Sequence, residues 1–513
     1  MKKILLCTTM LAVLFSTSCS KDNQNLNEEN ITTETSDLEQ ENPLTVSEIN
    51  QIINEQIKSK GDFNWNEVSD FVLWSALMHG ENILTIGYGS SDGDYQNRNS
   101  SEQKSSKDKI ISVIRGIENE NSLNRGESLL VHDDEILTII DVKVSNKNTI
   151  QELRKDASIR YMEPAGYSYF QGDNKQRKSN EANSSSGSGC GKESESLSAS
   201  DYTTITPNAK MPWNFPIHNI DGAWSHSTGS GITIGIVDTG ASTSQYLLNS
   251  GINNGSSSGK SIQRHGVYVD SFWPWSTKTD GVNDKCGHGT SMTAIAGAPR
   301  NDKGLPVGVA YNSNLVVYRA ASNVVLDGYH EQKGVAKALT QLGDNNNVKI
   351  ISMSMGHIFT VNRIKDAIRY ANNKGKLIFC AAGTSTSFTN FVGVIFPASM
   401  SETVAVTGIE QNSIYKECDT CHEGSEVDFT IMMERSNNNH VPVLSYYSDQ
   451  TDYVGGSSVA TAMTAGIAAL VWSKNPSWSK TQVLDKLKTS AHLYPNKHSS
   501  FGWGMLDALE AVQ

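Results

Sequence analysis

Three glycine-bounded stretches, far apart in the 513-residue chain, set the strongest constraint on its fold. The first is the apolar run Ile232–Asp238, which ends in an acidic residue. The second is Gly287–Gly297, where a Gly-His-Gly turn around His288 leads into small residues. The third is Gly455–Gly466, where a Gly-Gly-Ser turn precedes Ser458. An apolar run of this length predicts a buried strand, and glycine turns that lead into small residues predict closely packed helices.

The three polar residues of these stretches fit one kind of chemistry. A strand that ends at Asp238 and a helix that begins near Ser458 place both side chains where open α/β sheets build their sites. A serine hydroxyl is a poor nucleophile until an imidazole takes its proton, and a carboxylate orients that imidazole. The sequence therefore predicts Ser458 as nucleophile, His288 as base and Asp238 as the residue that orients His288. The Ser458 backbone N–H, at a helix start, is predicted to stabilise an oxyanion.

Each of these residues also has an ordinary structural interpretation. An aspartate after a strand is usually a turn residue or a helix cap, and a Gly-His-Gly-Thr stretch is commonly a loop. A serine after two glycines is often a flexible turn or an N-cap. The order of the three residues and the segments that flank them favour the catalytic interpretation.

The order Asp, His, Ser is that of subtilisin, and it differs from the orders in chymotrypsin and in α/β-hydrolases. With its flanking segments, the region 206–513 resembles the subtilisin-like serine proteases, the subtilases. This resemblance implies a three-layer α/β catalytic domain with a mostly parallel sheet, which hydrolyses peptide bonds through an acyl-enzyme. The matching flanks are residues 209–224, 304–311, 315–320, 350–356, 377–383, 396–399 and 403–408.

The chain departs from the family pattern at the expected oxyanion hole. The family usually has an asparagine where this chain has Thr384, and loss of such a donor lowers turnover roughly 10²–10³-fold, a figure that itself comes from subtilisin. The Ser458 N–H remains, so a slow or selective protease is expected. The alternative is a degenerate subtilase that binds a peptide or partner without efficient turnover.

A second departure concerns the expected substrate cleft. The resemblance places one wall of the cleft at Ser354, Met355, Gly356 and His357. The family usually has a glycine at the position of His357, and an imidazole there is expected to narrow or polarise the pocket. A loop histidine is also often a plain surface residue.

The N-terminus has the features of an export signal. Met1-Lys-Lys3 precedes an apolar run and small residues before Cys19, which resembles the lipidated cysteine of a bacterial lipoprotein. A plain secretory signal is the alternative. Residues 20–43 are polar and are expected to form a disordered tether. The sequence thus predicts export to the cell envelope or surface, with a lipid anchor on the precursor and release of the mature domain.

Residues 44–170 are expected to form a propeptide. Helices are predicted from Val46 and over Asn64–Leu77. The core 83–167 then shows a βαββαβ order, which is typical of a small α+β ferredoxin-like domain and resembles the inhibitory propeptide of subtilases. We expect it to inhibit its own catalytic domain, with cleavage in the flexible linker 171–205. An accessory domain that stays attached is the alternative.

Cysteines, charge and metal motifs complete the predictions. Cys418 and Cys421 are expected to close a small disulfide, because a zinc site there would lack further ligands. Cys286 is expected to be a small apolar neighbour of His288. No cofactor is required, and Asn301–Gly304 is either a structural calcium loop or a plain turn. A net charge of −12 and the lack of a basic cluster argue against nucleic acid as a partner, leaving peptide or protein substrates.

Overall fold

The structure is a computed structural model that describes residues 42–118, 128–170, 190–384, 393–411 and 415–513. The predicted signal, the lipidated Cys19 and nearly all of the predicted tether lie outside the described residues. The same holds for residues 171–189 of the predicted linker.

The N-terminal region contains a four-stranded antiparallel sheet in the order β2-β3-β1-β4. Two helices join its strands in a βαββαβ sequence, so the predicted ferredoxin-like arrangement is confirmed. The elements are β1 (Ile83–Tyr88), α3 (Ser101–Ile117), β2 (Leu130–Asp133), β3 (Ile139–Lys143), α4 (Lys147–Leu153) and β4 (Ile159–Pro164).

Two further helices precede this sheet, α1 (Val46–Lys60) and α2 (Asp70–His79). The prediction of one continuous helix over Asn64–Leu77 is wrong. The Ser69 hydroxyl accepts a hydrogen bond from the Val72 N–H at 3.3 Å, which makes Ser69 an N-cap and starts α2 only at Asp70.

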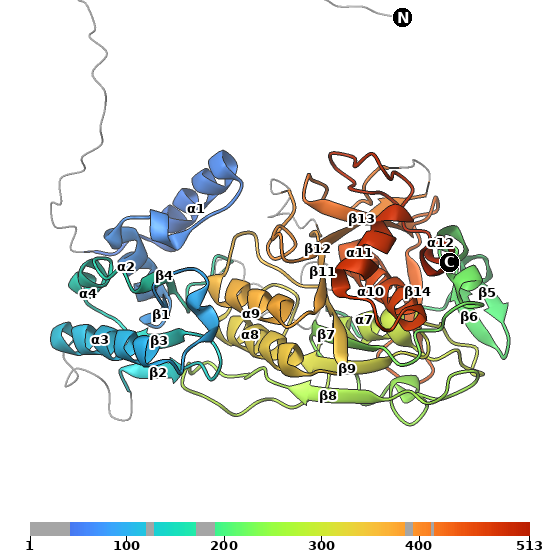
Figure 1. Ribbon diagram of the computed structural model, residues 1–513, viewed down its shortest axis with the longest axis horizontal. Coiled ribbons are helices and arrows are strands. Elements are labelled where there is room, and N and C mark those ends of the chain that lie inside the picture. Colours follow the sequence, from blue (N-terminus) through green and yellow to red (C-terminus); the bar gives the residue numbers. More distant parts are fainter. Residues whose placement is uncertain (1–41, 119–127, 171–189, 385–392, 412–414) are drawn as a thin grey trace, which may run out of the picture. The chain divides into compact units, whose positions relative to one another are not determined.

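The C-terminal region is built on a seven-stranded sheet in the order β13-β12-β11-β10-β7-β9-β8, and every pairing in it is parallel (Figure 1). This confirms the predicted α/β class with a parallel sheet. The strands are β7 (Thr233–Asp238), β8 (Ile262–Gly266), β9 (Asn314–Arg319), β10 (Val348–Met353), β11 (Leu377–Ala381), β12 (Val404–Glu410) and β13 (Val427–Glu434).

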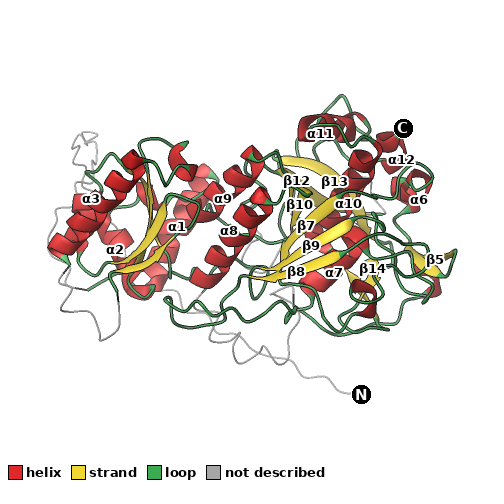
Figure 2. Cartoon of the chain, turned by 60° about the horizontal axis from the view of Figure 1, so that its bottom comes forward, coloured by secondary structure: helices red, strands yellow, loops and turns green. Residues whose placement is uncertain are grey.

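Helices cover both faces of this sheet, as Figure 2 shows. Side chains alternate between the faces along each strand. Ile236 packs in one core cluster with helices α7 (His288–Gly297) and α10 (Gly456–Lys474). Val237 packs in the other cluster with α8 (Tyr329–Asp344) and α9 (Asn362–Asn373). Smaller elements complete the region: β5 (Tyr202–Ile205), β6 (Ala209–Pro212), α6 (Ile220–Ala223), β14 (Val441–Leu444), β15 (Thr451–Val454), α11 (Lys480–Thr489) and α12 (Ala508–Val512).

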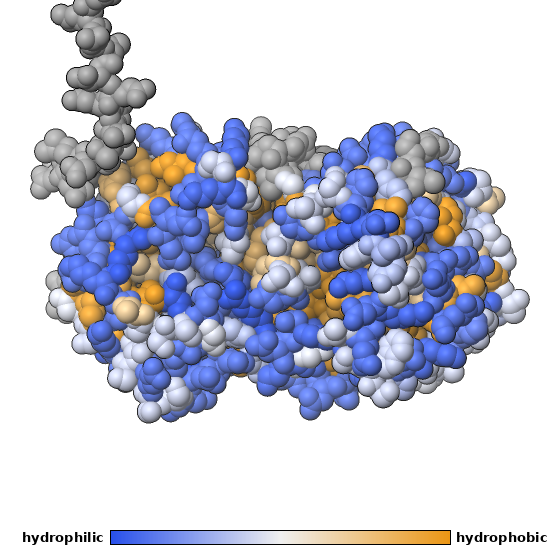
Figure 3. Space-filling model, turned by 45° about the horizontal axis from the view of Figure 1, so that its top comes forward, coloured by the Kyte–Doolittle hydropathy of each residue, from blue (hydrophilic) through white to orange (hydrophobic). Residues whose placement is uncertain are grey.

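Helix α10 is apolar because it lies in the core. It is the one helix among the described residues that is long and apolar enough to cross a membrane, and 89% of its most apolar window is buried within the fold. The face of the molecule in Figure 3 is largely hydrophilic, with exposed apolar side chains in separate patches. Burial of α10 brings its first turn to the edge of the sheet where β7, β10 and β11 end.

The N-terminal region packs on α8 and α9 through buried charged groups. Arg363 of α9 forms an ion pair with Asp141 of β3. Arg160 of β4 forms a second ion pair with Asp366 of α9, with 2.7 Å between Nη2 and Oδ2. All four side chains are at most 3% exposed. Removing one partner of a buried pair leaves an uncompensated charge, so these pairs make the contact specific.

Candidate active site

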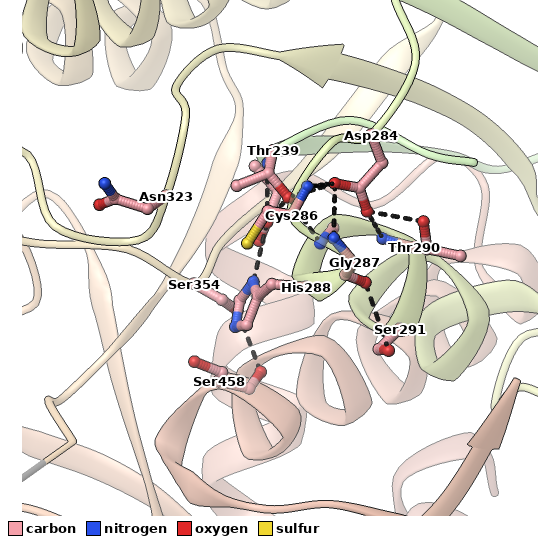
Figure 4. Close-up of polar contacts among 12 residues, drawn as sticks. Thr239, Asp284, Cys286, Gly287, His288, Thr290, Ser291, Asn323, Ser354 and Ser458 are labelled. Carbon is pink, nitrogen blue, oxygen red and sulfur yellow. Dashed lines mark hydrogen bonds and ion pairs between the residues drawn. The ribbon is translucent and has the colours of Figure 1, made fainter. Parts of the chain in front are cut away.

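The three predicted catalytic residues meet at the carboxyl edge of the parallel sheet. Asp238 is the last residue of β7 and is fully buried. His288 is the first residue of α7, and its Nδ1 lies 2.8 Å from Asp238 Oδ1. Ser458 lies in the first turn of α10, and Figure 4 shows its hydroxyl directed at the His288 imidazole.

The geometry sets the protonation pattern of His288. A carboxylate can only accept, so Nδ1 of His288 donates to Asp238 and Nε2 is left as the basic nitrogen. Burial by itself would lower the pKa of His288. The charge and hydrogen bond of Asp238, with the charge of Asp284, outweigh burial and raise that pKa above its ordinary value. The site therefore stabilises the imidazolium that forms when His288 takes up a proton.

Asp284, which the sequence analysis missed, holds the loop that precedes His288. Its carboxylate is fully buried and accepts five hydrogen bonds. Thr239 Oγ1 lies 3.0 Å from Asp284 and 3.3 Å from Asp238, so it lies between the two acids. The signal for Asp284 was local, because an aspartate that accepts from the second and third following N–H groups is typical of a turn. The other donors are the N–H groups of Cys286 and Gly287, and the N–H and hydroxyl of Thr290.

A disulfide joins the same loop to the described part of the predicted linker. Cys190 is bonded to Cys286, so the prediction that Cys286 is only an apolar neighbour of His288 is wrong. The Gly191 N–H donates to the Cys286 carbonyl at 3.0 Å. Gly287 has a φ of +104°, and a Cβ there would lie 1.9 Å from the Gly191 oxygen, so this close approach requires glycine.

The second disulfide lies beside the expected oxyanion position. Cys418 and Cys421 are bonded, as predicted, while Cys380 is a buried free thiol. Cys421 forms an isolated bridge with Thr384. The disulfide loop therefore supports the chain at Thr384.

Thr384 is exposed and contacts the serine before the predicted nucleophile. Its Oγ1 lies 3.3 Å from Ser457 Oγ. The Ser457 hydroxyl donates to the Gly383 carbonyl at 2.8 Å, so the Thr384 hydroxyl is the donor in its contact with Ser457. The Thr384 proton is thereby directed toward Ser457.

The residues of the expected cleft wall follow β10. The Ser354 hydroxyl donates to the Ser458 carbonyl at 3.0 Å. Met355 and His357 are each 3% exposed. The Gly356 N–H donates to Val324, and the Gly356 carbonyl accepts from Leu326, each at 3.0 Å. Both main-chain groups of Gly356 are therefore already paired within the chain.

The described residues contain no group of three or more His, Cys, Asp or Glu side chains arranged to hold a metal ion. In the loop Asn301–Gly304, predicted as either a calcium loop or a plain turn, the buried side chain of Asn301 holds the turn. Asn301 Oδ1 accepts from the Lys303 and Leu305 N–H groups at 3.0 and 3.2 Å, and Nδ2 donates to the Leu305 carbonyl at 2.9 Å. An amide that donates to a carbonyl in this way does not fit a cation site, which needs oxygens directed at the ion.

Comparison with known proteins gives a consistent result. Residues 229–504 match the model of the Subtilase family, Peptidase_S8. A subtilisin of Bacillus sp. strain TA39 is 27% identical over 310 residues, which cover 57% of this chain and 68% of the relative. The M-protease of Shouchella clausii strain KSM-K16 is 27% identical over 317 residues, covering 61% and 73%.

Two solved structures are also similar to this chain. The structure of MycP1 from the ESX-1 type VII secretion system matches with a TM-score of 0.46 at 20% identity, covering 64% of this chain and 93% of that one. Sphericase matches with a TM-score of 0.45 at 26% identity, covering 57% and 97%. Because the family model spans more than half of the sequence, this chain belongs to the subtilase family of serine proteases.

Proposed function

We propose that the protein is an exported serine endopeptidase that cleaves peptide bonds through Asp238, His288 and Ser458 and is made as a self-processing precursor. One observation carries the proposal. The buried Asp238 binds Nδ1 of His288, and the Ser458 hydroxyl points at the same imidazole. This is the relation among acid, base and nucleophile that acyl transfer requires.

The reaction follows from these positions. Ser458 Oγ attacks the peptide carbonyl carbon while His288 Nε2 takes the hydroxyl proton, and Asp238 stabilises the resulting imidazolium. The Ser458 N–H, at the start of α10, supports the oxyanion, and Thr384 is the second donor proposed for it, with its hydroxyl turning from Ser457 to the oxyanion. The imidazolium then protonates the leaving amine, which gives an acyl-enzyme. Water, activated by His288, releases the acid and restores Ser458.

The N-terminal region acts in this proposal as an intramolecular inhibitor. Its buried ion pairs with α9 support a firm contact before processing. Processing is proposed within the linker 171–205. Within that linker, the Glu195 N–H donates to Thr451 at 2.8 Å and Cys190 is bonded to Cys286, so its described part already contacts the catalytic region. Cys19 would anchor the precursor in a membrane.

A second candidate function is favoured by Thr384 alone. A subtilase whose oxyanion donor is replaced can bind peptides or a partner without efficient turnover. The buried, hydrogen-bonded Asp238 and His288 argue for the enzyme, since a binder does not need this arrangement.

The test is expression of the precursor with and without Ser458→Ala, followed by mass spectrometry and fluorophosphonate labelling. If the protein is an enzyme, the parent should be processed and should carry a fluorophosphonate adduct on Ser458. The Ser458→Ala protein should show neither processing nor the adduct. Ser473→Ala, near the far end of the same helix, is the matched control and should behave like the parent. A parent that is neither processed nor labelled favours the binder.

A further inference from the structure

The segment that follows β12 contains a buried histidine outside the catalytic triad. His422 is 5% exposed and directly follows the disulfide Cys418–Cys421. Its main-chain N–H donates to the Gly383 carbonyl at 3.1 Å, and its Nδ1 lies 2.8 Å from the Gly393 carbonyl. This one residue therefore contacts the chain on both sides of Thr384.

The hydrogen bond to Gly393 fixes the tautomer of His422. A carbonyl can only accept, so Nδ1 carries the proton and Nε2 is the bare nitrogen. Nε2 is buried and has no hydrogen-bond partner among the described residues. Burial lowers the pKa of His422, although the bond to Gly393 opposes this, because a second proton would be a buried donor without an acceptor. His422 therefore acts as a neutral hydrogen-bond donor.

The imidazole of His422 lies directly against the main chain of Gly383. Gly383 has a φ of +131°, and a Cβ there would lie 2.5 Å from His422 Nδ1, so this contact requires glycine. The Gly383 carbonyl also accepts from the Ser457 hydroxyl at 2.8 Å. Ser457 directly precedes the proposed nucleophile, so the Gly383 carbonyl joins His422 to the turn that carries Ser458.

This carbonyl belongs to the same peptide unit as the N–H of Thr384. A peptide unit is planar, so the two hydrogen bonds that fix the Gly383 carbonyl also fix the direction in which the chain enters Thr384. Cys421, next to His422, pairs with Thr384 in an antiparallel bridge. Thr384 is therefore held by the Cys418–His422 segment as well as by α10.

Strand β12 supports this segment from the other side. The Thr407 hydroxyl donates to the His422 carbonyl, and the Cys418 N–H donates to the Gly408 carbonyl at 3.3 Å. The disulfide packs on Gly408, where a Cβ would lie 2.7 Å from Cys421 Sγ. Because β12 is a buried strand of the parallel sheet, His422 is carried on a rigid element.

We propose that His422 is a positioning residue for the oxyanion hole, which holds the Gly383–Thr384 peptide where the Thr384 hydroxyl reaches the oxyanion. The inference rests on the proposed protease function and adds a residue that acts through Thr384. An oxyanion donor stabilises charge that develops only in the transition state. Loss of its position should therefore lower kcat and leave KM nearly unchanged.

The first test compares two substitutions of His422 in the mature enzyme, with peptide hydrolysis as the assay. His422→Leu removes the donor to Gly393 and should lower kcat by about tenfold or more, with KM within about twofold of the parent. Asparagine places an N–H group where histidine has Nδ1, so His422→Asn should restore most of kcat. The exposed His226→Leu is the matched control and should behave like the parent. Equal kcat in the parent and in His422→Leu would overturn the inference.

A double-mutant cycle separates positioning from a general loss of structure. Thr384→Val replaces the hydroxyl by a methyl group, so His422 then has no oxyanion donor to position. In that background, His422→Leu should lower kcat by less than about threefold. A fall in kcat as large as that in the parent would show that His422 supports the fold in general, and would overturn the inference.

A third measurement does not require catalysis. A parent that fluorophosphonate does not label would count against the protease function, whereas the contacts of His422 are tested by amide hydrogen exchange in the Ser458→Ala precursor. The Gly383 N–H donates to Ser457 Oγ at 3.2 Å, and its exchange should be about tenfold faster in His422→Leu than in His422→Asn. Equal exchange of this amide in the two variants would overturn the inference.

Discussion

Glu163 links the N-terminal region to α9, and its titration should make that contact depend on pH. Its carboxyl group accepts from the Asn362 N–H at 3.0 Å and from Asn362 Nδ2 at 2.7 Å. The N-cap residue of α9, Val361, makes no side-chain cap of its own, so Glu163 does so from another region. Burial raises the pKa of Glu163 to about 7, although the Asn362 hydrogen bonds and Arg363 oppose this and Asp366 adds to it.

The sign and size of the effect follow from this shift. The docked state holds the Glu163 proton more tightly than a separated or unfolded state, whose pKa lies near the ordinary 4.5. The stabilisation is therefore complete below pH 4.5, is lost as the pH rises toward 7, and changes little above that. A difference of about 2.5 pH units corresponds to roughly 3 kcal/mol at most.

The assay is urea unfolding of the Ser458→Ala precursor, which prevents processing, at steps from pH 4.5 to 8. Other groups also titrate, so the informative quantity is the difference between this protein and the same protein carrying Glu163→Gln. That difference should change by up to about 3 kcal/mol between pH 4.5 and 7 and then level off. Glu152→Gln, on the exposed face of α4, should show no such change. If the free energy of unfolding depended on pH in the same way in the protein with Glu163 and in the Glu163→Gln protein, the reasoning would be refuted.

Three other predictions concern the catalytic region. Asp284→Asn places an amide group against the N–H donors of the loop before His288. It should slow fluorophosphonate labelling by at least tenfold, because a buried hydrogen bond to a charge contributes about 1.5–3 kcal/mol. An unchanged labelling rate would contradict the positioning role of Asp284. Thr384→Asn supplies a longer donor and should raise kcat in peptide hydrolysis, whereas a large fall would show that threonine suits its site better. The double change Cys190→Ser and Cys286→Ser opens a link between residues 96 apart and should lower the free energy of unfolding by about 2–4 kcal/mol in urea titration. Equal stability with and without the disulfide would contradict that value.

Much of the fold could be predicted because its signals are local. The apolar run that ends at Asp238 and the glycine turns before His288 and Ser458 are short patterns, and each leads to the strand or helix that the structure contains. The βαββαβ order of the N-terminal region could be predicted for the same reason. The prediction over Asn64–Leu77 is wrong because apolar residues recur at helical spacing on both sides of Ser69, and the capping role of Ser69 overrides that periodicity.

The parts that could not be predicted depend on contacts between distant residues. Nothing near Cys190 indicates a bond to Cys286, because a disulfide depends on the spatial approach of two segments. Asp327 has the sequence context of any acid before a helix, and its hydrogen bonds to Tyr169 and Phe170 depend on the packing of two distant segments. His357 departs from the family pattern in the sequence, but nothing near it indicates that Asp327 is its partner.

The crosslink between Cys190 and Cys286 has a consequence for the matured protein. If the linker is cut just before Cys190, as proposed, the covalent bond to Cys286 keeps the new amino terminus close to the loop that carries His288. Such an end cannot drift away or exchange with the ends of other molecules. While the disulfide is intact, the loop that carries His288 therefore stays bonded to the segment at Cys190. A reducing environment would break this bond and free both the loop and the amino terminus.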